Sequence, residues 1–577
     1  MSRLNLRIDT LAMRTIGCVL LLAVSANGAN GANLTVKSGG GGNFATIQAC
    51  ATAMAPGDTC TVYAGTYNEN VTVPAGTAGN YKTITVNGTD VVQVKGFTLG
   101  SHTKLVGNCP TLQGTVTTAT CGFFITNPSS PNTACVSMGN STTDVYIRLN
   151  TMYACGGIGP GWPTNVSYIY IQGNTGSYPN STIATVPASC GGSGSPVGNN
   201  IDLYGSHILV EKNDFSHFTI SLSWNVQYSM TRNNNSHDMY EINNAGNCHG
   251  DTWFSEPGVS VNDLYNVYEG NLQYNGYGSD IKGQLSQGET CGGTCQVLIE
   301  RFNVTSRVGG GIVSNDTTWN AVKVYNNTWT SPLADSNFSC GNASINNSVP
   351  IAGQTTSLSA YLNDIYYITN AAANSGCFNA YQLSTSSGSS GVWGYNLAFC
   401  VGGCHTVYGH LYQSGTFASE TGQKIADPKF ANYISDGNTS NDYHLQAGSP
   451  AIAAGTYLTT VASGDSGSGT SLVVSDASFF QDGYGLSNAY STVSGDCIAI
   501  GTASNHVCVT AVNYSTNTLT LASSISRSSG QGVYLYSKSD GVQVLTGNAP
   551  DLGARPYGSG STTTSVAPPT GLAAVVN

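Results

Sequence analysis

Residues 145–150 read VYIRLN, a short alternating apolar strand that ends in an asparagine. The same pattern returns as YIYIQGN, HILVEKN, YSMTRN, VYEGN, VLIERFN and VKVYNN. The asparagines that end these segments are Asn150, Asn174, Asn213, Asn233, Asn271, Asn303 and Asn326. Their spacings cluster in the twenties, with insertions, and this period predicts a solenoid in which each coil supplies a few short strands and stacks on the coil before it.

Stacked coils explain why the recurring residue is asparagine. Strands of successive coils lie about 4.8 Å apart in long parallel sheets, and their inward side chains form apolar ladders. Asparagine tolerates the left-handed backbone of a sharp turn, so we expect the turn asparagines to hydrogen-bond to one another along the stack.

The composition indicates an all-β protein. Only 8% of the 577 residues are charged, whereas an average soluble domain carries about 25%, and Gly, Asn, Ser and Thr make up much of the polar half. Such a chain favours turns and short strands over amphipathic helices.

The stretch GNFATIQACATAMAPGDTCTVYAGTYNENVTV at 42–73 resembles the opening coil of right-handed parallel β-helix proteins of the pectate-lyase-like superfamily. The resemblance implies a β-helix over 33–456, with a short N-terminal helix that ends before Pro56 and covers the open sheet edge. The segments DYHLQAGSPAIAAGT at 442–456 and DLGARPYG at 551–558 resemble the two pieces of a terminal coil. The superfamily contains lyases, hydrolases, epimerases and proteins without catalysis, so the resemblance concerns the fold.

Between the two terminal pieces, residues 457–545 alternate short strands with turn signals. This pattern predicts a small inserted β-barrel or sandwich, after which residues 546–558 return to the last coil. Residues 559–577 are predicted to be a polar linker and tail.

Residues 1–26 have the pattern of a signal peptide, with three arginines before the apolar run IGCVLLLAV, which is too short to span a bilayer. We therefore expect an extracellular, secreted protein without a membrane span. Cleavage would leave a formal net charge of −13, which disfavours nucleic acid and acidic membrane surfaces as partners.

Sixteen cysteines remain after residue 26, an even number that suits disulfides in an oxidising compartment. Most lie in near-neighbour couples, which predicts local pairs. The expected pairs are Cys50–Cys60, Cys109–Cys121, Cys135–Cys155, Cys291–Cys295, Cys340–Cys377, Cys400–Cys404, Cys497–Cys508 and Cys190–Cys248.

The stretch NCHGDTWFSE at 247–256 concentrates ionisable groups in a chain that has few. An offset of 31 residues aligns HGDTWF with DIKGQL and brings His249 beside Asp280 and Asp251 beside Lys282; a second offset of 31 reaches GIVSND at 311–316. If these intervals are single coils, the side chains project from one sheet face. The expected cluster also draws on neighbouring residues, namely His237, Asp238, Glu241, Glu256 and Arg307.

Three chemistries fit this cluster. In a lyase, carboxylates of Asp238, Glu241, Asp251 and Asp280 would hold Ca²⁺, which neutralises a uronic acid, while Lys282 or Arg307 takes the α-proton. In an inverting hydrolase, Asp251 and Asp280 would be acid and base, assisted by His249. In plain binding, Trp253, Tyr274 and Tyr277 would stack on sugar rings, with His237, Glu256 and Arg307 as polar contacts.

Two classes of function therefore remain open. The first is an exported carbohydrate-active enzyme, a polysaccharide lyase or glycoside hydrolase, with its polysaccharide along the sheet around residues 237–316. The second is a non-catalytic cell-surface or matrix protein built on a rigid β-helix rod, in which Asp and His cap turns and Lys282 pairs with Asp280. The complete motif set of polygalacturonases and the arginine-rich constellation of pectate lyases are both missing.

Overall fold

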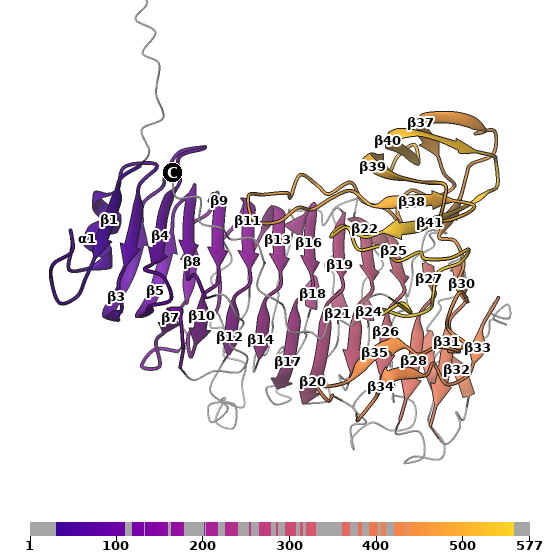
Figure 1. Ribbon diagram of the computed structural model, residues 1–577, viewed down its shortest axis with the longest axis horizontal. Helices are drawn as coiled ribbons and strands as arrows, with labels where there is room; N and C mark the ends of the chain where they lie inside the picture. Colours follow the sequence, from indigo (N-terminus) through magenta and orange to yellow (C-terminus); the bar gives the residue numbers. More distant parts are fainter. Residues whose placement is uncertain are drawn as a thin grey trace, which may run out of the picture.

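The protein is described by a computed structural model whose secondary structure is almost entirely β (Figure 1). The described residues are 31–109, 118–131, 133–159, 163–177, 201, 203–216, 226–240, 253–255, 265–277, 284–286, 295–306, 312–314, 319–330, 360–369, 379–383, 392–401, 406–410, 421–435 and 437–558.

Within the described residues, two 14-stranded parallel sheets run the length of the molecule, and we name them sheets A and B. Sheet A contains β1 (Asn33–Val36), β2 (Thr59–Val62), β4 (Lys82–Val86), β6 (Thr103–Val106), β9 (Thr143–Arg148), β11 (Val166–Gln172), β13 (Gly205–Glu211), β15 (Val226–Gln227), β16 (Ser229–Arg232), β19 (Asn266–Glu269), β22 (Cys295–Arg301), β25 (Trp319–Tyr325), β27 (Ala360–Leu362) and β30 (Val392–Gly394). Sheet B contains β3 (Gly65–Val73), β5 (Val91–Leu99), β7 (Gly122–Thr126), β8 (Val136–Met138), β10 (Thr151–Tyr153), β12 (Thr175–Ser177), β14 (Asp214–Ser216), β17 (Asn235–Tyr240), β20 (Leu272–Tyr277), β23 (Val304–Ser306), β26 (Thr328–Thr330), β28 (Ile365–Ile368), β31 (Leu397–Cys400) and β33 (Lys424–Ile425).

A third parallel face, sheet C, completes the coils. Its described strands are β18 (Trp253–Ser255), β21 (Gln284–Ser286) and β24 (Ile312–Ser314), together with the pair β29 (Asn379–Leu383) and β32 (Thr406–His410). Along the chain, a coil passes through sheets A, B and C in turn, as in β16, β17 and β18 before β19. The winding is right-handed, as crossovers between parallel strands nearly always are, and the predicted right-handed parallel β-helix is confirmed.

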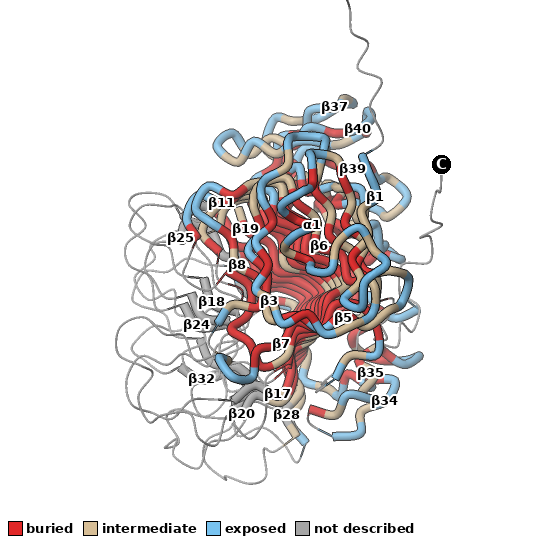
Figure 2. The backbone as a smooth tube through the Cα atoms, turned by 90° about the vertical axis from the view of Figure 1, so that its left-hand side faces the viewer, coloured by how far each residue is buried: buried red, intermediate tan, exposed pale blue. Residues whose placement is uncertain are grey.

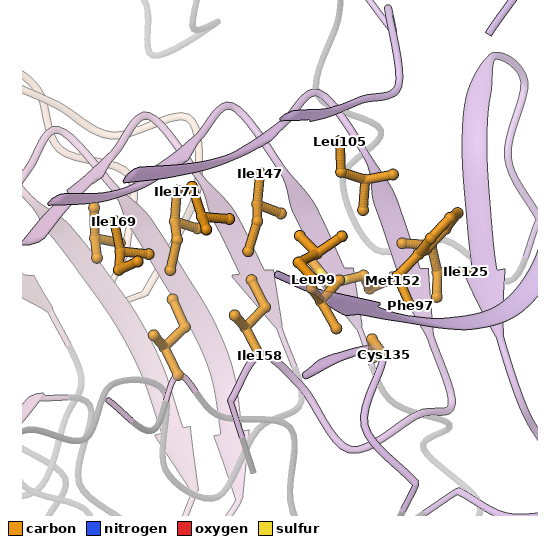
Figure 3. Packing of buried hydrophobic residues seen from close by; sticks show 14 of the residues in the cluster. Phe97, Leu99, Leu105, Ile125, Cys135, Ile147, Met152, Ile158, Ile169 and Ile171 are labelled. Carbon is orange, nitrogen blue, oxygen red and sulfur yellow. The ribbon is translucent and has the colours of Figure 1, made fainter. Parts of the chain in front are cut away.

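Buried residues line the inside of the coils (Figure 2), and apolar side chains from successive coils stack there (Figure 3). Ile147 pairs in register with Ile171, and Ile171 with Val210, and all three side chains are buried. Each fully buried aliphatic side chain contributes about 1.5–3 kcal/mol relative to an exposed one, so the repeated strand pattern supplies the core.

The predicted asparagine ladder is present at the turn from sheet A to sheet B. The side-chain amide of each asparagine donates to Oδ1 of the next, over 2.9–3.2 Å. The members are Asn150, Asn174, Asn213, Asn234, Asn271, Asn303 and Asn327, and the ladder continues through Asp364 to Asn396. Two expected members were wrong by one residue, because Asn233 and Asn326 take the left-handed turn position (φ 54° and 56°) just before the ladder.

Helix α1 (Ile47–Ala53) covers the N-terminal end of the core, as predicted. The Thr46 hydroxyl accepts from Ala49 N, and the Glu69 carboxylate accepts from the backbone N–H groups of Ile47 and Gln48. These acceptors satisfy first-turn donors that a helix cannot pair internally.

The inserted domain near the C-terminus is an antiparallel six-stranded sheet, as the sequence predicted in outline. Its strands are β36 (Thr459–Thr460), β37 (Gly467–Val473), β38 (Cys497–Ile500), β39 (His506–Asn513), β40 (Thr518–Arg527) and β41 (Gly532–Ser537). Before it, β34 (Phe430–Asn432) and β35 (Asp442–Leu445) form a hairpin that packs on the outside of sheet B.

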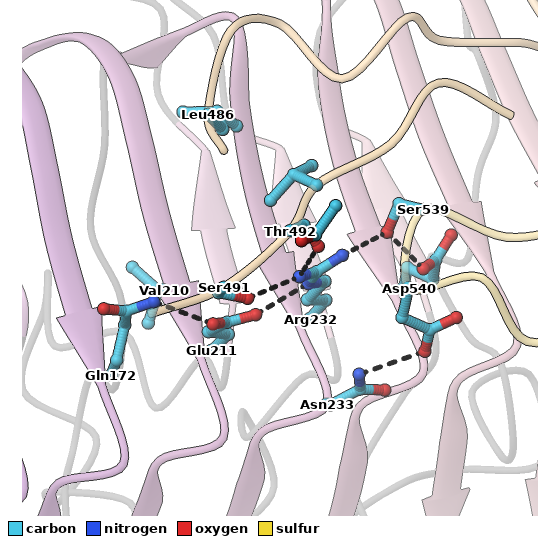
Figure 4. A network of polar contacts seen from close by, with 12 residues as sticks. Gln172, Val210, Glu211, Arg232, Asn233, Leu486, Ser491, Thr492, Ser539 and Asp540 are labelled. Atoms are coloured by element: carbon cyan, nitrogen blue, oxygen red, sulfur yellow. Dashed lines mark hydrogen bonds and ion pairs between the residues drawn. The ribbon is translucent and has the colours of Figure 1, made fainter. Parts of the chain in front are cut away.

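The inserted domain is docked on the outer face of sheet A through buried ion pairs (Figure 4). Arg232 binds Glu211 at 2.8 Å and donates to Ser539 and Ser491 of the inserted domain. Arg301 pairs with Glu269 and with Asp496 of the inserted domain, and its side chain is fully buried. The domain therefore closes the outer face of sheet A over these coils.

Four predicted disulfides are present, Cys50–Cys60, Cys109–Cys121, Cys135–Cys155 and Cys497–Cys508. Each of the other four predicted pairs includes a cysteine outside the described residues. The predicted signal peptide at 1–26 and the predicted tail at 559–577 also lie outside them. Within the described residues, no helix has the length and apolar character needed to cross a membrane.

Candidate functional site

The structure describes part of the predicted cluster. His237, Asp238 and Tyr274 are described with their side chains, and Trp253 and Tyr277 are described only as members of β18 and β20. The remaining predicted residues lie outside the described residues; they are Glu241, His249, Asp251, Glu256, Asp280, Lys282 and Arg307.

His237, Asp238 and Tyr274 lie on two neighbouring strands of sheet B, β17 and β20, and β14 is the next strand on the other side of β17. The asparagine ladder sets their register, because β14, β17 and β20 each begin immediately after a ladder asparagine. This register places His237 opposite Ser216 on one side and opposite Tyr274 on the other. Inward positions of the same strands include Phe215 of the core, so His237 and Tyr274, one residue further, point outward.

His237 is held between two carboxylates. Its Nε2 is 2.8 Å from Oδ1 of Asp214, and its Nδ1 is 2.7 Å from Oδ2 of Asp238. The ring stacks on Tyr274 with centroids 4.8 Å apart and an interplanar angle of 5°. Asn275 donates to Oδ1 of Asp238 at 3.2 Å, so both oxygens of that carboxylate are engaged.

These contacts fix the charge of the imidazole. Burial on its own would lower the pKa of His237, but the hydrogen bonds to Asp214 and Asp238 and the two negative charges raise it to about 9. At neutral pH the ring is therefore an imidazolium that donates from both nitrogens. Burial also raises the pKa of the Tyr274 phenol, which stays neutral.

The contacts of the His237 cluster determine which ligands it can bind and whether it can transfer a proton. His237 and Tyr274 are buried, but Oδ2 of Asp214 has no hydrogen-bond donor among the described residues, so this carboxylate could accept a hydrogen bond from a hydroxylated ligand. His237 cannot act as a general base at neutral pH, because both nitrogens are protonated and both are engaged.

The described residues alone do not form a metal site. Among them, no group of three or more His, Cys, Asp or Glu side chains is arranged to hold an ion. Of the four predicted Ca²⁺ ligands, only Asp238 is described, and a cation there would compete with the imidazolium of His237.

Sheet C tests the register on which the rest of the cluster depends. Trp253 pairs with Gln284, an offset of 31 residues, as the sequence alignment of HGDTWF with DIKGQL requires. Gln284 then pairs with Ile312, so the second offset is 28 residues and the predicted second offset of 31 was wrong. The difference arises because loop lengths vary from coil to coil while strand pairing is kept.

The coverage of the outer faces limits where a ligand can lie. The inserted domain covers sheet A through Arg232 and Arg301, and the β34–β35 hairpin covers the later strands of sheet B, where Gly437 N donates to Ser306 at 3.0 Å. The His237 cluster lies on the earlier strands of sheet B, and sheet C adjoins sheet B where β29 contacts β28 and β31.

Sequence reasoning missed Asp214, the first partner of His237. The signal was available: the segments NDFSH at 213–217 and NNSHD at 234–238 align when Asn213 is matched to Asn234. The misassigned ladder asparagine, Asn233, concealed this alignment.

No family model matches the chain, and no curated protein matches its sequence. Solved structures with similarity to it include an alginate lyase from Paenibacillus sp. str. FPU-7, at 12% identity over 52% of this chain and 93% of that chain, with a TM-score of 0.29. A second is the pectate lyase Pel9A, at 12% identity over 73% of this chain and 88% of that chain, with a TM-score of 0.33. A third is a GH136 lacto-N-biosidase from Eubacterium ramulus, at 8% identity over 68% of each chain, with a TM-score of 0.33.

Proposed function

We propose that the protein is a secreted carbohydrate-active enzyme, a polysaccharide lyase or an inverting glycoside hydrolase, that binds a polysaccharide along the side where sheets B and C adjoin. The observation that carries this proposal is the His237 cluster, in which an imidazolium holds Asp214 and Asp238 next to the face of Tyr274. A chain with 8% charged residues concentrates two carboxylates and a cation there.

The two reactions use the cluster differently. In a lyase, Lys282 or Arg307 would take the α-proton, and Ca²⁺ held by Asp251 and Asp280 would neutralise the uronate, because the His237 cluster, one imidazolium between two carboxylates, has no net positive charge. In a hydrolase, Asp251 and Asp280 are acid and base, and the His237 cluster binds sugar hydroxyls at a neighbouring subsite.

The register of sheet C supports this assignment of roles. The 31-residue offset between Trp253 and Gln284 is the offset that pairs the segment containing His249 and Asp251 with the segment containing Asp280 and Lys282. Secretion is supported by the N-terminal apolar segment and by the four disulfides.

The test is a polysaccharide panel that includes polygalacturonate, alginate, xylan and arabinan. Ultraviolet absorbance detects unsaturated ends and a reducing-sugar assay detects hydrolysis, each with and without chelator. Asp251→Ala and Lys282→Ala are expected to abolish product, whereas His237→Gln lowers activity and raises KM. Asp427→Asn, at an exposed carboxylate between β33 and β34, is the matched control.

A second function, a non-catalytic surface or matrix rod, is favoured by one observation. Both nitrogens of His237 and both oxygens of Asp238 are engaged within the protein, as in an ion cluster that only stabilises the fold. Product in neither assay, with Asp251→Ala and Lys282→Ala indistinguishable from the parent, would favour this second function.

A further inference from the structure

A column of mostly aromatic side chains runs along the N-terminal ends of the sheet A strands, away from the His237 cluster. The strand registers place its members at equivalent positions of successive coils. In order, they are Tyr81, His102, Asp144, Tyr168, His207, Tyr228 and Tyr265. Tyr514 of the inserted domain extends the column, because its ring stacks on Tyr265 at 4.2 Å with an interplanar angle of 10°.

Most members of the column have an unfavourable, left-handed backbone conformation. Six successive members have positive φ angles, between 49° and 63°, although none is glycine. These members are His102, Asp144, Tyr168, His207, Tyr228 and Tyr265. Left-handed backbone is unfavourable for bulky side chains and tends to persist at functional positions, so its repetition over six coils points to a use for the column.

Asp144 is the one position of the column without a ring. Its neighbour on one side, Tyr168, stacks on His207 with centroids 4.6 Å apart, and the side chain of Tyr168 is 40% exposed. The register places Asp144 opposite Tyr168 on the side away from His207, so the face of the Tyr168 ring that His207 does not cover adjoins the coil of Asp144. A flat ring at the level of Asp144 would complete the stack.

The polar groups at this level are arranged to hold one carboxylate oxygen and leave the other available. The Tyr81 hydroxyl donates to Oδ2 of Asp144, and Nδ1 of His102 is 3.2 Å from the same oxygen. Among the described residues, no donor reaches Oδ1 of Asp144. The carboxylate is fixed in direction and retains an acceptor for a ligand.

The charges nearby favour a neutral ligand. Lys104 contacts the ring of Tyr81, the residue whose hydroxyl donates to Asp144, and its Nζ lies 4.2 Å from the centre of that ring. Burial lowers the pKa of His207, so the ring beneath Tyr168 is neutral at pH 7 and the stack is an uncharged platform. An exposed aromatic face with an adjacent oriented carboxylate is the combination that recognises a sugar ring by its apolar face and its hydroxyls.

We propose that Tyr168 and Asp144 form a binding subsite for a neutral pyranose unit, which stacks on the free face of Tyr168 and donates a hydroxyl hydrogen to Oδ1 of Asp144. This subsite rests on the proposed function only in taking a polysaccharide as the class of ligand, and it requires no catalysis. It would anchor a neutral stretch of polymer at the edge of sheet A, near the inserted domain, whose Tyr490 packs on Tyr146 of the same strand as Asp144.

Calorimetry of the full chain with xylohexaose, cellohexaose, mannohexaose and hexagalacturonate tests the proposal. The parent is expected to bind at least one of the three neutral hexasaccharides more tightly than hexagalacturonate. Tyr168→Ala and Asp144→Ala should each weaken that binding by about tenfold, as truncation of a central contact does. Tyr168→Phe keeps the ring and should stay within about twofold. Tyr557→Ala, at a tyrosine that is 43% exposed elsewhere, should change nothing.

A second measurement uses the parent protein, so its result does not depend on whether a variant folds. With labelled histidines, the bound hexasaccharide should shift the NMR signal of His102 and leave that of His506 in the inserted domain unchanged. Absence of neutral binding in the parent, equal binding by Tyr168→Ala, or an unmoved His102 signal would overturn the subsite.

The outcomes also separate this subsite from the proposed enzyme. Binding that depends on Tyr168 in a protein that cleaves no polysaccharide would support the subsite and overturn the catalysis. Cleavage that depends on Asp251, together with hexasaccharide binding that is unchanged in Tyr168→Ala, would support the catalysis and overturn the subsite.

Discussion

At the scale of single residues, the protonation of His237 gives a direct prediction. Its pKa of about 9 in the folded chain exceeds the unfolded value of 6.5, so the bound proton stabilises the fold. That stabilisation is complete below pH 6.5 and is lost as the pH rises through 9. Because one pKa unit corresponds to about 1.4 kcal/mol, the loss amounts to about 3 kcal/mol.

Denaturant unfolding at pH 6 and at pH 9.5 measures this effect. His237→Gln should be destabilised relative to the parent at pH 6 and much less so at pH 9.5. His506→Gln, at a histidine whose partners are the carbonyl of Ala503 and the ring of Tyr536, serves as the control and should change the stability little at either pH. An equal destabilisation by His237→Gln at both pH values would contradict the imidazolium assignment.

The carboxylate in the asparagine ladder gives a second prediction at this scale. Burial raises the pKa of Asp364 to about 7, although hydrogen bonds from Asn327 and Tyr366 oppose the rise. Folding therefore favours the neutral acid, and its contribution is complete below pH 3.8 and lost as the pH rises through 7. Asp364→Asn should raise the stability at pH 8 by about 4 kcal/mol and change it little at pH 4.

Thermal midpoints at the two pH values check this expectation. The reverse exchange, Asn303→Asp, introduces a buried carboxylate into a ladder position and should lower the midpoint at pH 8 more than at pH 4. If Asp364→Asn is destabilising at pH 8, the ladder does not require a neutral group at this position.

At the scale of elements, the ion pairs beneath the inserted domain predict how firmly it is attached. Arg301→Ala leaves the buried carboxylates of Glu269 and Asp496 without their cation, which should cost about 3–5 kcal/mol. Arg527→Ala removes a pair with Asp465 inside the inserted domain, with side chains 9% and 14% exposed, and should cost less. Calorimetric unfolding compares the two, and limited proteolysis of the inserted domain should accelerate only in Arg301→Ala. Equal losses would mean that the docking interface is not stabilised by Arg301.

The elements also show where sequence reasoning succeeds and where it stops. Strand segments and ladder asparagines could be predicted because each coil repeats the same burial pattern. Asn233 was chosen over Asn234 because both satisfy the turn chemistry, and only the pairing with Asn213 and Asn271 decides between them. Asp214 was missed for the same reason, since its partner His237 is fixed by coil register and not by local pattern.

At the scale of the whole molecule, the β-helix, its N-terminal helix and the inserted domain follow from the sequence. The position at which the inserted domain docks on sheet A could not be predicted from the sequence. Arg232 and Arg301 occupy strand positions like any other, and their partners Ser539 and Asp496 lie 307 and 195 residues away. Such contacts depend on tertiary packing, and they exclude a ligand from the covered part of sheet A.

The N-terminal end gives the last prediction, because a stack of parallel strands must be closed to prevent edge-to-edge association. Glu69 of β3 accepts hydrogen bonds from Ile47 N and Gln48 N and so fastens helix α1 to the first coil. Glu69→Ala should lower the stability by about 1–2 kcal/mol and expose the edge of β1. Light scattering should then show self-association that increases with concentration, whereas Glu69→Gln, which keeps one acceptor oxygen, should remain closer to the parent. A Glu69→Ala protein that is destabilised but stays monodisperse would show that the disulfide Cys50–Cys60 holds the helix in place without the carboxylate.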